Sequence, residues 1–214
     1  RFGRLALNML ERSDVGEQKA SIYHLVNAFV IHWKEHVRDT LKPLSEGFQS
    51  GLETGDFEYA AHCAFFHSYH SFVSGEELTA VEEVMNRNSD AIGYLRQETS
   101  VYMHDINRQT VSDLRGKPET SFFLAGEYYD EQSMAPRHQD ANDRTTLFIL
   151  YINKLLLNYF FCEYLQAIES GSMAEKCLDG VIGIVGVSLL YFYDSLARLA
   201  VYSSSEKPMR RRIM

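Results

Sequence analysis

The chain has 214 residues, of which 45% are hydrophobic and 23% charged, values of an ordinary globular protein that is long enough to bury a core. Its formal net charge is −8 and its only basic cluster is Arg210–Arg212, which argues against a nucleic-acid or other phosphate-binding surface. Three widely spaced cysteines lie in apolar segments and predict reduced, buried thiols of a cytosolic protein: Cys63, Cys162 and Cys177.

Apolar, helix-like segments follow one another along the chain with a period of about 21 residues. Only four prolines interrupt them, and strand patterns are scarce. Helices are expected to open near Gln18, Glu35, Asp56, Glu76, Glu98, Thr120, Asn142, Glu163 and Gly183. The pattern predicts an all-α protein, an α-solenoid of antiparallel helical hairpins with about nine helices. It would form one helical-repeat region over residues 1–202, followed by a disordered tail at 203–214.

The segment from Asp56 to Val73, DFEYAAHCAFFHSYHSFV, is the clearest predicted helix. Asp56 can cap its first turn, and apolar residues occupy two faces. Tyr59, Cys63, Phe66, His70 and Val73 form one face, and Phe57, Ala60, Ala61 and Ala64 form the other. A helix that is apolar on two faces must be covered on two sides, so we expect it to lie inside a stack. The next helix, with Leu78, Val81, Met85, Ile92 and Leu95 on one face, is expected to be more exposed.

The weakest part of the pattern is residues 120–141, where GEYYDEQSMAPRHQD contains a proline and predicts a short helix followed by a loop. Regular helices resume at Asn142 or Asp143, again at Glu163, and finally near Gly183 or Gly186, the last one running to Tyr202. Residues Val181–Tyr193 are free of charge, but this run is shorter than the roughly 20 apolar residues that a spanning helix needs. We therefore expect a buried helix there and no membrane insertion.

The pair of predicted helices over residues 142–178 is similar to a tetratricopeptide hairpin. Tyr164, Ala167, Gly171 and Ala174 match the second helix of that repeat, and DFEYA at 56–60 gives a second partial match. A glycine expected in the first helix is missing, and the hairpin of about 42 residues is longer than the usual 34. The spacing supports a tetratricopeptide-like repeat.

Side chains that could carry chemistry are few. His32 with His36, and His67 with His70, have helical spacing for a shared metal, but a structural zinc site needs about four ligands and no cysteine pair is near. Any exposed histidine is also a candidate for the phosphorylated residue of a phosphorelay. The glycines at 180, 183 and 186 lack the spacing of a nucleotide loop, and kinase and hydrolase signatures are missing. We therefore predict no catalytic, cofactor-binding or metal-binding residue in this chain.

The polar residues that we select for function are Asn153, Lys154 and Asn158, in the otherwise apolar segment 142–162. Lys154 and Asn158 are four residues apart and share a helix face. In a stack of helical hairpins such residues can line a concave groove and hold the carboxylate or backbone of a bound segment. The alternative is a solvated stripe, or amides that satisfy neighbouring backbone groups.

From His32 onward the chain resembles the helical middle region of large cyanobacterial-type signalling proteins. Six stretches carry the resemblance: HWKEHVRDTL (32–41), SGLETGDFEYAAHCAFFHSYHSF (50–72), AIGYLRQET (91–99), ANDRTTLFILYINKLLLNYFF (141–161), AEKCLDGVIG (174–183) and FYDSLARLAVYS (192–203). Those proteins join a serine/threonine kinase, an AAA-type ATPase, a tetratricopeptide-like region, a GAF sensor and a histidine kinase. After Ser203 this chain departs from the pattern with SSEKPMRRRIM.

The resemblance implies cytoplasmic signal transduction in a parent protein whose other domains bind ATP. None of the family's catalytic motifs lies in this chain, so the resemblance assigns it no catalytic residue and no cofactor. We expect a non-catalytic scaffold that contacts protein modules of the same chain or a signalling partner. The alternative is a ligand-sensing domain that holds a small apolar effector among its aromatic residues, Phe65, Phe66, Phe148, Tyr151 and Phe160.

Overall fold

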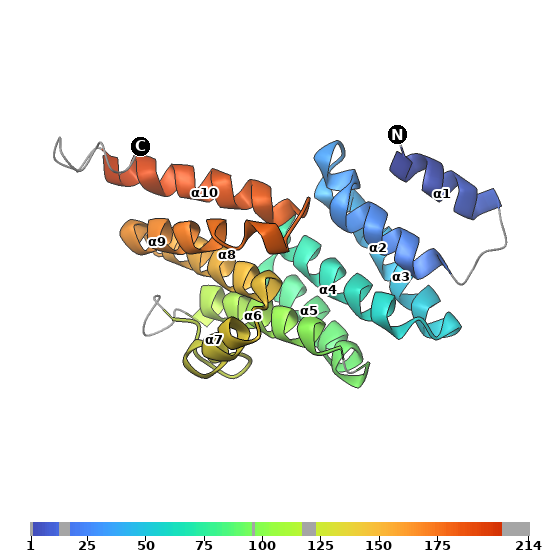
Figure 1. Cartoon of the computed structure of the whole chain (residues 1–214), viewed down its shortest axis with the longest axis horizontal. Coiled ribbons are helices and arrows are strands. Elements are labelled where there is room, and N and C mark those ends of the chain that lie inside the picture. The colour runs from blue at the N-terminus through green and yellow to red at the C-terminus, as the bar shows by residue number, and fades with distance from the viewer. Residues whose placement is uncertain (1, 13–17, 96, 117–122, 203–214) are drawn as a thin grey trace. The chain divides into compact units, whose positions relative to one another are not determined.

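The computed structural model describes residues 2–12, 18–95, 97–116 and 123–202, and nearly all of them lie in helices (Figure 1). Its α-helices are α1 (Phe2–Arg12), α2 (Lys19–Phe29), α3 (Leu41–Thr54), α4 (Phe57–Val73), α5 (Leu78–Tyr94), α6 (Glu98–Gly116), α7 (Glu131–Asp140), α8 (Arg144–Phe160), α9 (Tyr164–Glu175) and α10 (Val185–Tyr202). Short 3-10 helices are η2 (Ile31–Trp33), η3 (Val37–Thr40) and η4 (Leu178–Gly180). The all-α class is confirmed.

The helices begin close to the openings that the sequence predicts. Asp56, Glu77 and Asp143 precede α4, α5 and α8, and each accepts hydrogen bonds from backbone N–H groups of the first turn. Helices α2, α6, α9 and α10 also start within two residues of the predicted positions. The predicted openings near Glu35 and Thr120 differ: η3 and then α3 follow the first, and the second lies outside the described residues, as does the predicted tail at 203–214.

The chain divides into two compact units, Arg1–Asp105 and Ile106–Met214, and the boundary falls within α6. The single helical-repeat region over 1–202 stays a prediction.

Helix α4 is the buried centre of the first unit and packs on α2, α3 and α5. Alanines 60, 61 and 64 are buried with Phe65, Phe66 and Tyr69, as predicted for an interior helix. Helix α3 approaches very closely: a Cβ at Gly51 would lie 2.8 Å from the Cβ of Ala60. Phe57 was expected to be covered, and that expectation was wrong, because it is the first residue of α4 and remains half exposed.

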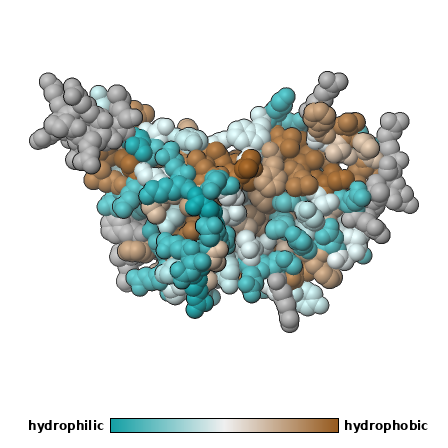
Figure 2. Space-filling view, viewed as in Figure 1, coloured by the Kyte–Doolittle hydropathy of each residue, from teal (hydrophilic) through white to brown (hydrophobic). Residues whose placement is uncertain are grey.

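The amphipathic helix α1 was not among the predicted openings. It packs on α2 through Gly3, where a Cβ would lie 3.3 Å from Val26, while Phe2, Leu5 and Met9 remain exposed. Figure 2 shows hydrophobic residues gathered over the region of α1 and α2. The spacing of Phe2, Leu5 and Met9 by three and four residues was the sequence signal for this helix.

Helix α8 is the buried centre of the second unit and packs on α7, α9 and α10. It ends at Phe160, and Cys162, two residues beyond, has a positive φ of 64°. Cys162 N–H donates to the carbonyl of Tyr159 at 3.1 Å, and Glu163 N–H donates to that of Asn158 at 2.8 Å, the hydrogen-bond pattern of a Schellman motif. This position exposes the Cys162 side chain, so the prediction of three buried thiols was wrong for Cys162, whereas Cys63 and Cys177 are buried.

The part of residues 120–141 that the structure describes has the reverse of the predicted order. A loop comes first, with a β-bridge between Ala125 and Asp130, and helix α7 follows with Pro136 inside it. The side chain of Asp130 accepts from Gln132 N–H and caps the helix. Within the described ranges, no helix has both the length and the hydropathy that crossing a bilayer requires.

Candidate functional site

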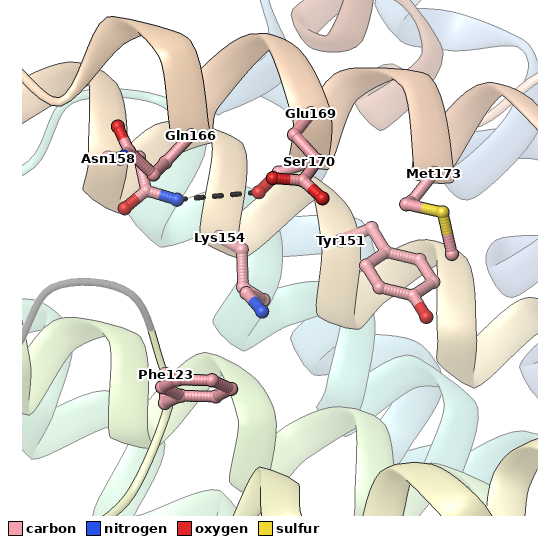
Figure 3. Close-up of a pocket in the computed structure, with 8 residues that line it drawn as sticks. All are labelled: Phe123, Tyr151, Lys154, Asn158, Gln166, Glu169, Ser170 and Met173. Carbon is pink, nitrogen blue, oxygen red and sulfur yellow. Dashed lines mark hydrogen bonds between the residues drawn. The ribbon is translucent and has the colours of Figure 1, made fainter.

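A pocket of about 440 Å³ opens on the second unit between α8, α9 and the segment before α7 (Figure 3). Helix α8 contributes Tyr151, Lys154 and Asn158, which its turns of 3.6 residues place on one side. Helix α9 contributes Gln166, Glu169, Ser170 and Met173, and Phe123 comes from the loop. The structure therefore brings together two of the three residues that the sequence selects, Lys154 and Asn158.

Lys154 forms an ion pair at the edge of this pocket. Its Nζ lies 2.5 Å from Glu131 Oε1, and the two side chains retain only 14% and 10% of their exposure. Glu131 belongs to the first turn of α7, and its Oε2 accepts from the backbone N–H of Leu124 at 3.1 Å. Lys154 Nζ also lies 5.1 Å from the centre of the Phe123 ring. The carboxylate neutralises the charge of Lys154, but an ammonium has three donors and Glu131 engages one of them.

Asn158 joins the two helices that form the wall of the pocket. Its Nδ2 donates to Ser170 Oγ at 3.3 Å, the bond drawn in Figure 3. Its side chain is buried, and its Oδ1 has no hydrogen-bond partner within the described part of the chain. Asn158 therefore fixes α9 against α8, and the polar groups at the surface of the pocket are those of Lys154, Gln166 and Glu169.

Asn153 lies elsewhere, in the interior of the second unit. Its side chain is fully buried, and its Nδ2 donates to Asn107 Oδ1 at 2.9 Å and to the carbonyl of Ile149 at 2.8 Å. It does not line the pocket. The arrangement corresponds to the alternative in which an amide satisfies neighbouring groups, with a side-chain partner on α6.

The floor of the pocket is apolar. Tyr151 is largely buried, and burial raises the pKa of its hydroxyl. A hydrogen bond with Gln139 partly offsets this rise. Met173 is half-buried, and Phe123 presents about half of its side chain to solvent. The pocket thus offers an apolar surface with one ammonium, one amide and one exposed carboxylate on its rim. It is suited to hold an apolar side chain and the backbone beside it.

Two residues in contact with Lys154, one of which lines the pocket, were beyond sequence reasoning. Glu131 and Phe123 lie more than 20 residues from Lys154 along the chain, in the segment with the weakest periodic pattern. Glu131 follows Asp130 at the start of α7, and an acidic pair before a helical segment is a helix-start signal. That signal locates the helix start but does not indicate a contact with Lys154.

The aromatic residues of the alternative effector site are distributed over both units. Phe65 and Phe66 are buried in α4 of the first unit, where Phe66 packs on His24 and Phe29. Phe148 is fully buried in α8, and Phe160 at the end of that helix is half exposed. Of the five residues, Tyr151 lines the pocket described here.

His36, His67 and His70, from the two pairs considered for metal binding, each have a hydrogen-bond partner. His36 Nδ1 accepts from Arg38 N–H and caps η3, while His70 Nδ1 lies 2.6 Å from Thr40 Oγ1. His67 Nδ1 lies 3.3 Å from Asn88 Nδ2. In the part of the chain that the structure describes, no three His, Cys, Asp or Glu side chains are grouped so that they could hold a metal ion.

Comparisons of the chain with protein-family models, with curated proteins and with solved structures gave no match.

Proposed function

We propose that this chain is a non-catalytic helical scaffold that binds a segment of another protein module in the pocket between α8 and α9. The observation that carries the proposal is the composition of that pocket, in which an apolar floor meets the Lys154 ammonium at the rim. A bound segment would place an apolar side chain between Phe123, Tyr151 and Met173. Its backbone carbonyl would accept a hydrogen bond from Lys154 Nζ, which keeps its pair with Glu131.

The wider context of this proposal is a stack of antiparallel, tetratricopeptide-like hairpins in a cytoplasmic, multidomain, ATP-dependent signalling kinase. The pattern of Tyr164, Ala167, Gly171 and Ala174 on α9 supports the repeat, and the stretches quoted above support the parent protein. In this setting the scaffold would transmit signals between the ATPase and kinase modules. Autophosphorylation or ATP hydrolysis by the purified chain would contradict a purely non-catalytic role.

A displayed library of short peptides tests the pocket without knowledge of the natural partner. We expect enriched peptides with an apolar anchor and a dissociation constant in the micromolar range. Substitution Lys154→Met keeps the aliphatic stem and removes the donors, so it should weaken binding about tenfold, the value of a hydrogen bond to a charged group. The matched control is Lys42→Met, since Lys42 lies on α3 of the first unit and is exposed.

The result that would overturn the proposal is equal affinity of the selected peptides for the Lys154→Met variant and the unchanged chain. A library that yields no binder would overturn it as well. Circular dichroism of each variant verifies that the helices are retained.

The pocket volume also favours a second candidate, a small apolar effector, because small-molecule sites commonly measure about 300–1,000 Å³. A ligand that binds the folded state raises the melting temperature with its concentration. A fragment screen that raises the melting temperature of the unchanged chain but not of a Tyr151→Ala variant would support sensing. Peptide binding that requires no small molecule would support the scaffold.

A further inference from the structure

The outer face of α10 carries a row of residues that remain exposed in the described part of the second unit. Ser188, Phe192, Ser195, Leu199 and Tyr202 are exposed, and half-buried Val185 begins the same row. We call these six residues the α10 seam. They are spaced alternately by three and four residues, the spacing by which one helix packs along another.

The α10 seam carries no charge. The two charged residues of α10, Asp194 and Arg198, form an ion pair with each other at 2.6 Å. Asp194 lies against α9, since its Oδ1 would be 2.8 Å from a Cβ at Gly171. A solvent-facing helix surface normally carries charged or polar residues, whereas this one carries large apolar side chains and serines. Such an uncharged, exposed row marks a contact surface.

We propose that two copies of this chain form a weak dimer through antiparallel contact of their α10 seams. In a two-fold contact, residue i of one copy meets residue j of the other, and j meets i. An axis that passes between Tyr193 and Asp194 places Phe192 opposite Ser195 of the second copy, and Leu199 opposite its Ser188. Val185 then faces Tyr202. Each large side chain meets a smaller one, as close packing of two helices requires.

A second copy fits this surface better than an unrelated partner does. When one copy of the row runs antiparallel to the other, a smaller residue stands opposite each larger one. No charge of the seam meets a like charge across the two-fold axis. The α10 seam has no charged residue, so it offers nothing to a partner that binds through charge.

The exposed area sets the expected strength of the dimer. Tyr191, which adjoins the seam, is 50% exposed, and Phe192, Leu199 and Tyr202 are 58%, 66% and 37% exposed. With about 200 Å² for each large side chain, these four present roughly 400 Å² per copy, or about 800 Å² for two copies. Stable complexes bury about 1,200–2,000 Å², so the α10 seam falls below that range and fits a weak, reversible contact. We expect dissociation in the micromolar range or weaker.

Sedimentation velocity of the full chain from low to several hundred micromolar tests the dimer. The unchanged chain should show a monomer–dimer equilibrium, and Phe192→Glu with Leu199→Glu should stay monomeric at every concentration. The matched control is Phe57→Glu, which changes an aromatic residue of similar exposure at the start of α4, where an acidic residue favours the helix. Circular dichroism checks that each variant is folded.

Cysteine crosslinking tests the orientation in a Cys162→Ser background. Ser188→Cys together with Leu199→Cys should give a covalent dimer on mild oxidation, while either substitution alone should not. The two positions are three turns apart on one helix and cannot form a bond within one copy. A chain that is monomeric throughout, or a dimer that survives the double glutamate substitution, overturns the proposal. Crosslinking by Ser188→Cys alone overturns the antiparallel arrangement.

Discussion

Helices α4 and α8 each form the buried centre of a unit, but they satisfy their buried polar groups differently. Around α4 these groups include imidazoles whose burial favours the neutral form: His70 is buried in it, and His24 of α2 stacks on His62 with both ring nitrogens lacking a hydrogen-bond partner among the described residues. In and around α8 they include paired amides and a largely buried ion pair, with Asn153 bonded to Asn107 and Lys154 paired with Glu131. We therefore expect the stability of the first unit to depend on pH. The stability of the second unit should fall when one residue of a bonded pair is substituted.

The residues with positive φ next to these helices also differ between the two units. In the first unit α3 ends at Gly55, with a φ of 79°. In the second unit Asn142 precedes α8 and Cys162 follows it, and both have a positive φ although they carry a side chain. Left-handed backbone costs a residue with a side chain more than it costs glycine.

Acidification should have the largest effect, and it acts on the first unit. Burial lowers the pKa of His24 and of His70 to about 3, compared with about 6.5 in an unfolded chain. Below pH 6.5 the unfolded state binds more protons than the folded state. The stability that these groups contribute is complete above pH 6.5 and declines as the pH falls toward 3. Between pH 7 and pH 5 the two histidines should cost about 4 kcal/mol, measured by urea unfolding.

Substitution His24→Phe keeps a ring against Phe29 and Phe66 and should remove about half of this pH dependence. The control is His138→Phe in the second unit, because the carboxylate of Asp143 opposes the lowering of the His138 pKa by burial. A free energy of unfolding that is equal at pH 7 and pH 5 would contradict the prediction.

Removal of the carboxylate that faces Lys154 should have the next largest effect, in the second unit. Glu131→Ala leaves a largely buried ammonium without its partner and the Leu124 N–H without an acceptor, so we expect a loss of about 2–3 kcal/mol at pH 7. The comparison is Glu46→Ala, whose two pairs, with Lys42 and Lys19, are exposed and should together be worth less than about 1 kcal/mol. Equal losses for the two variants would disprove the role of burial.

The amide pair of Asn107 and Asn153 should give a smaller change. Asn153→Leu removes two hydrogen bonds and leaves Asn107 Oδ1 without its donor, at a cost of about 1–2 kcal/mol. The double variant Asn107→Leu with Asn153→Leu should be less destabilised than the sum of the single variants, because no amide is then left unpaired. If the losses of unfolding free energy of the two single variants add up to that of the double variant in chemical denaturation, the two amides do not act together.

The smallest effect concerns the end of α8. Cys162→Gly relieves the left-handed conformation of a residue with a side chain and should raise the free energy of unfolding by up to about 1 kcal/mol. Cys162→Ala removes the thiol but keeps a Cβ, so it should give no such gain. If the alanine and glycine variants unfold at the same urea concentration, the backbone of Cys162 is not strained.

The sequence predicts those features that depend on neighbouring residues. Helix starts follow from local caps such as Asp56 and Asp143, and the common face of Lys154 and Asn158 follows from their spacing. The contacts of Lys154 with Glu131 and of Asn153 with Asn107 join segments more than 20 residues apart, and no periodicity specifies them. Exposure at helix ends was also missed, because Phe57 and Cys162 occupy terminal turns where an apolar residue is not necessarily covered.

The order of packing in each unit has a consequence for how the chain folds. In the first unit α2 packs on α3, α3 on α4 and α4 on α5, and in the second unit α8 packs on α9 and α9 on α10. Contacts between successive helices require only short loops to close, which favours fast folding. During synthesis, helices α2 to α4 can therefore assemble while the residues of α8 to α10 have yet to leave the ribosome.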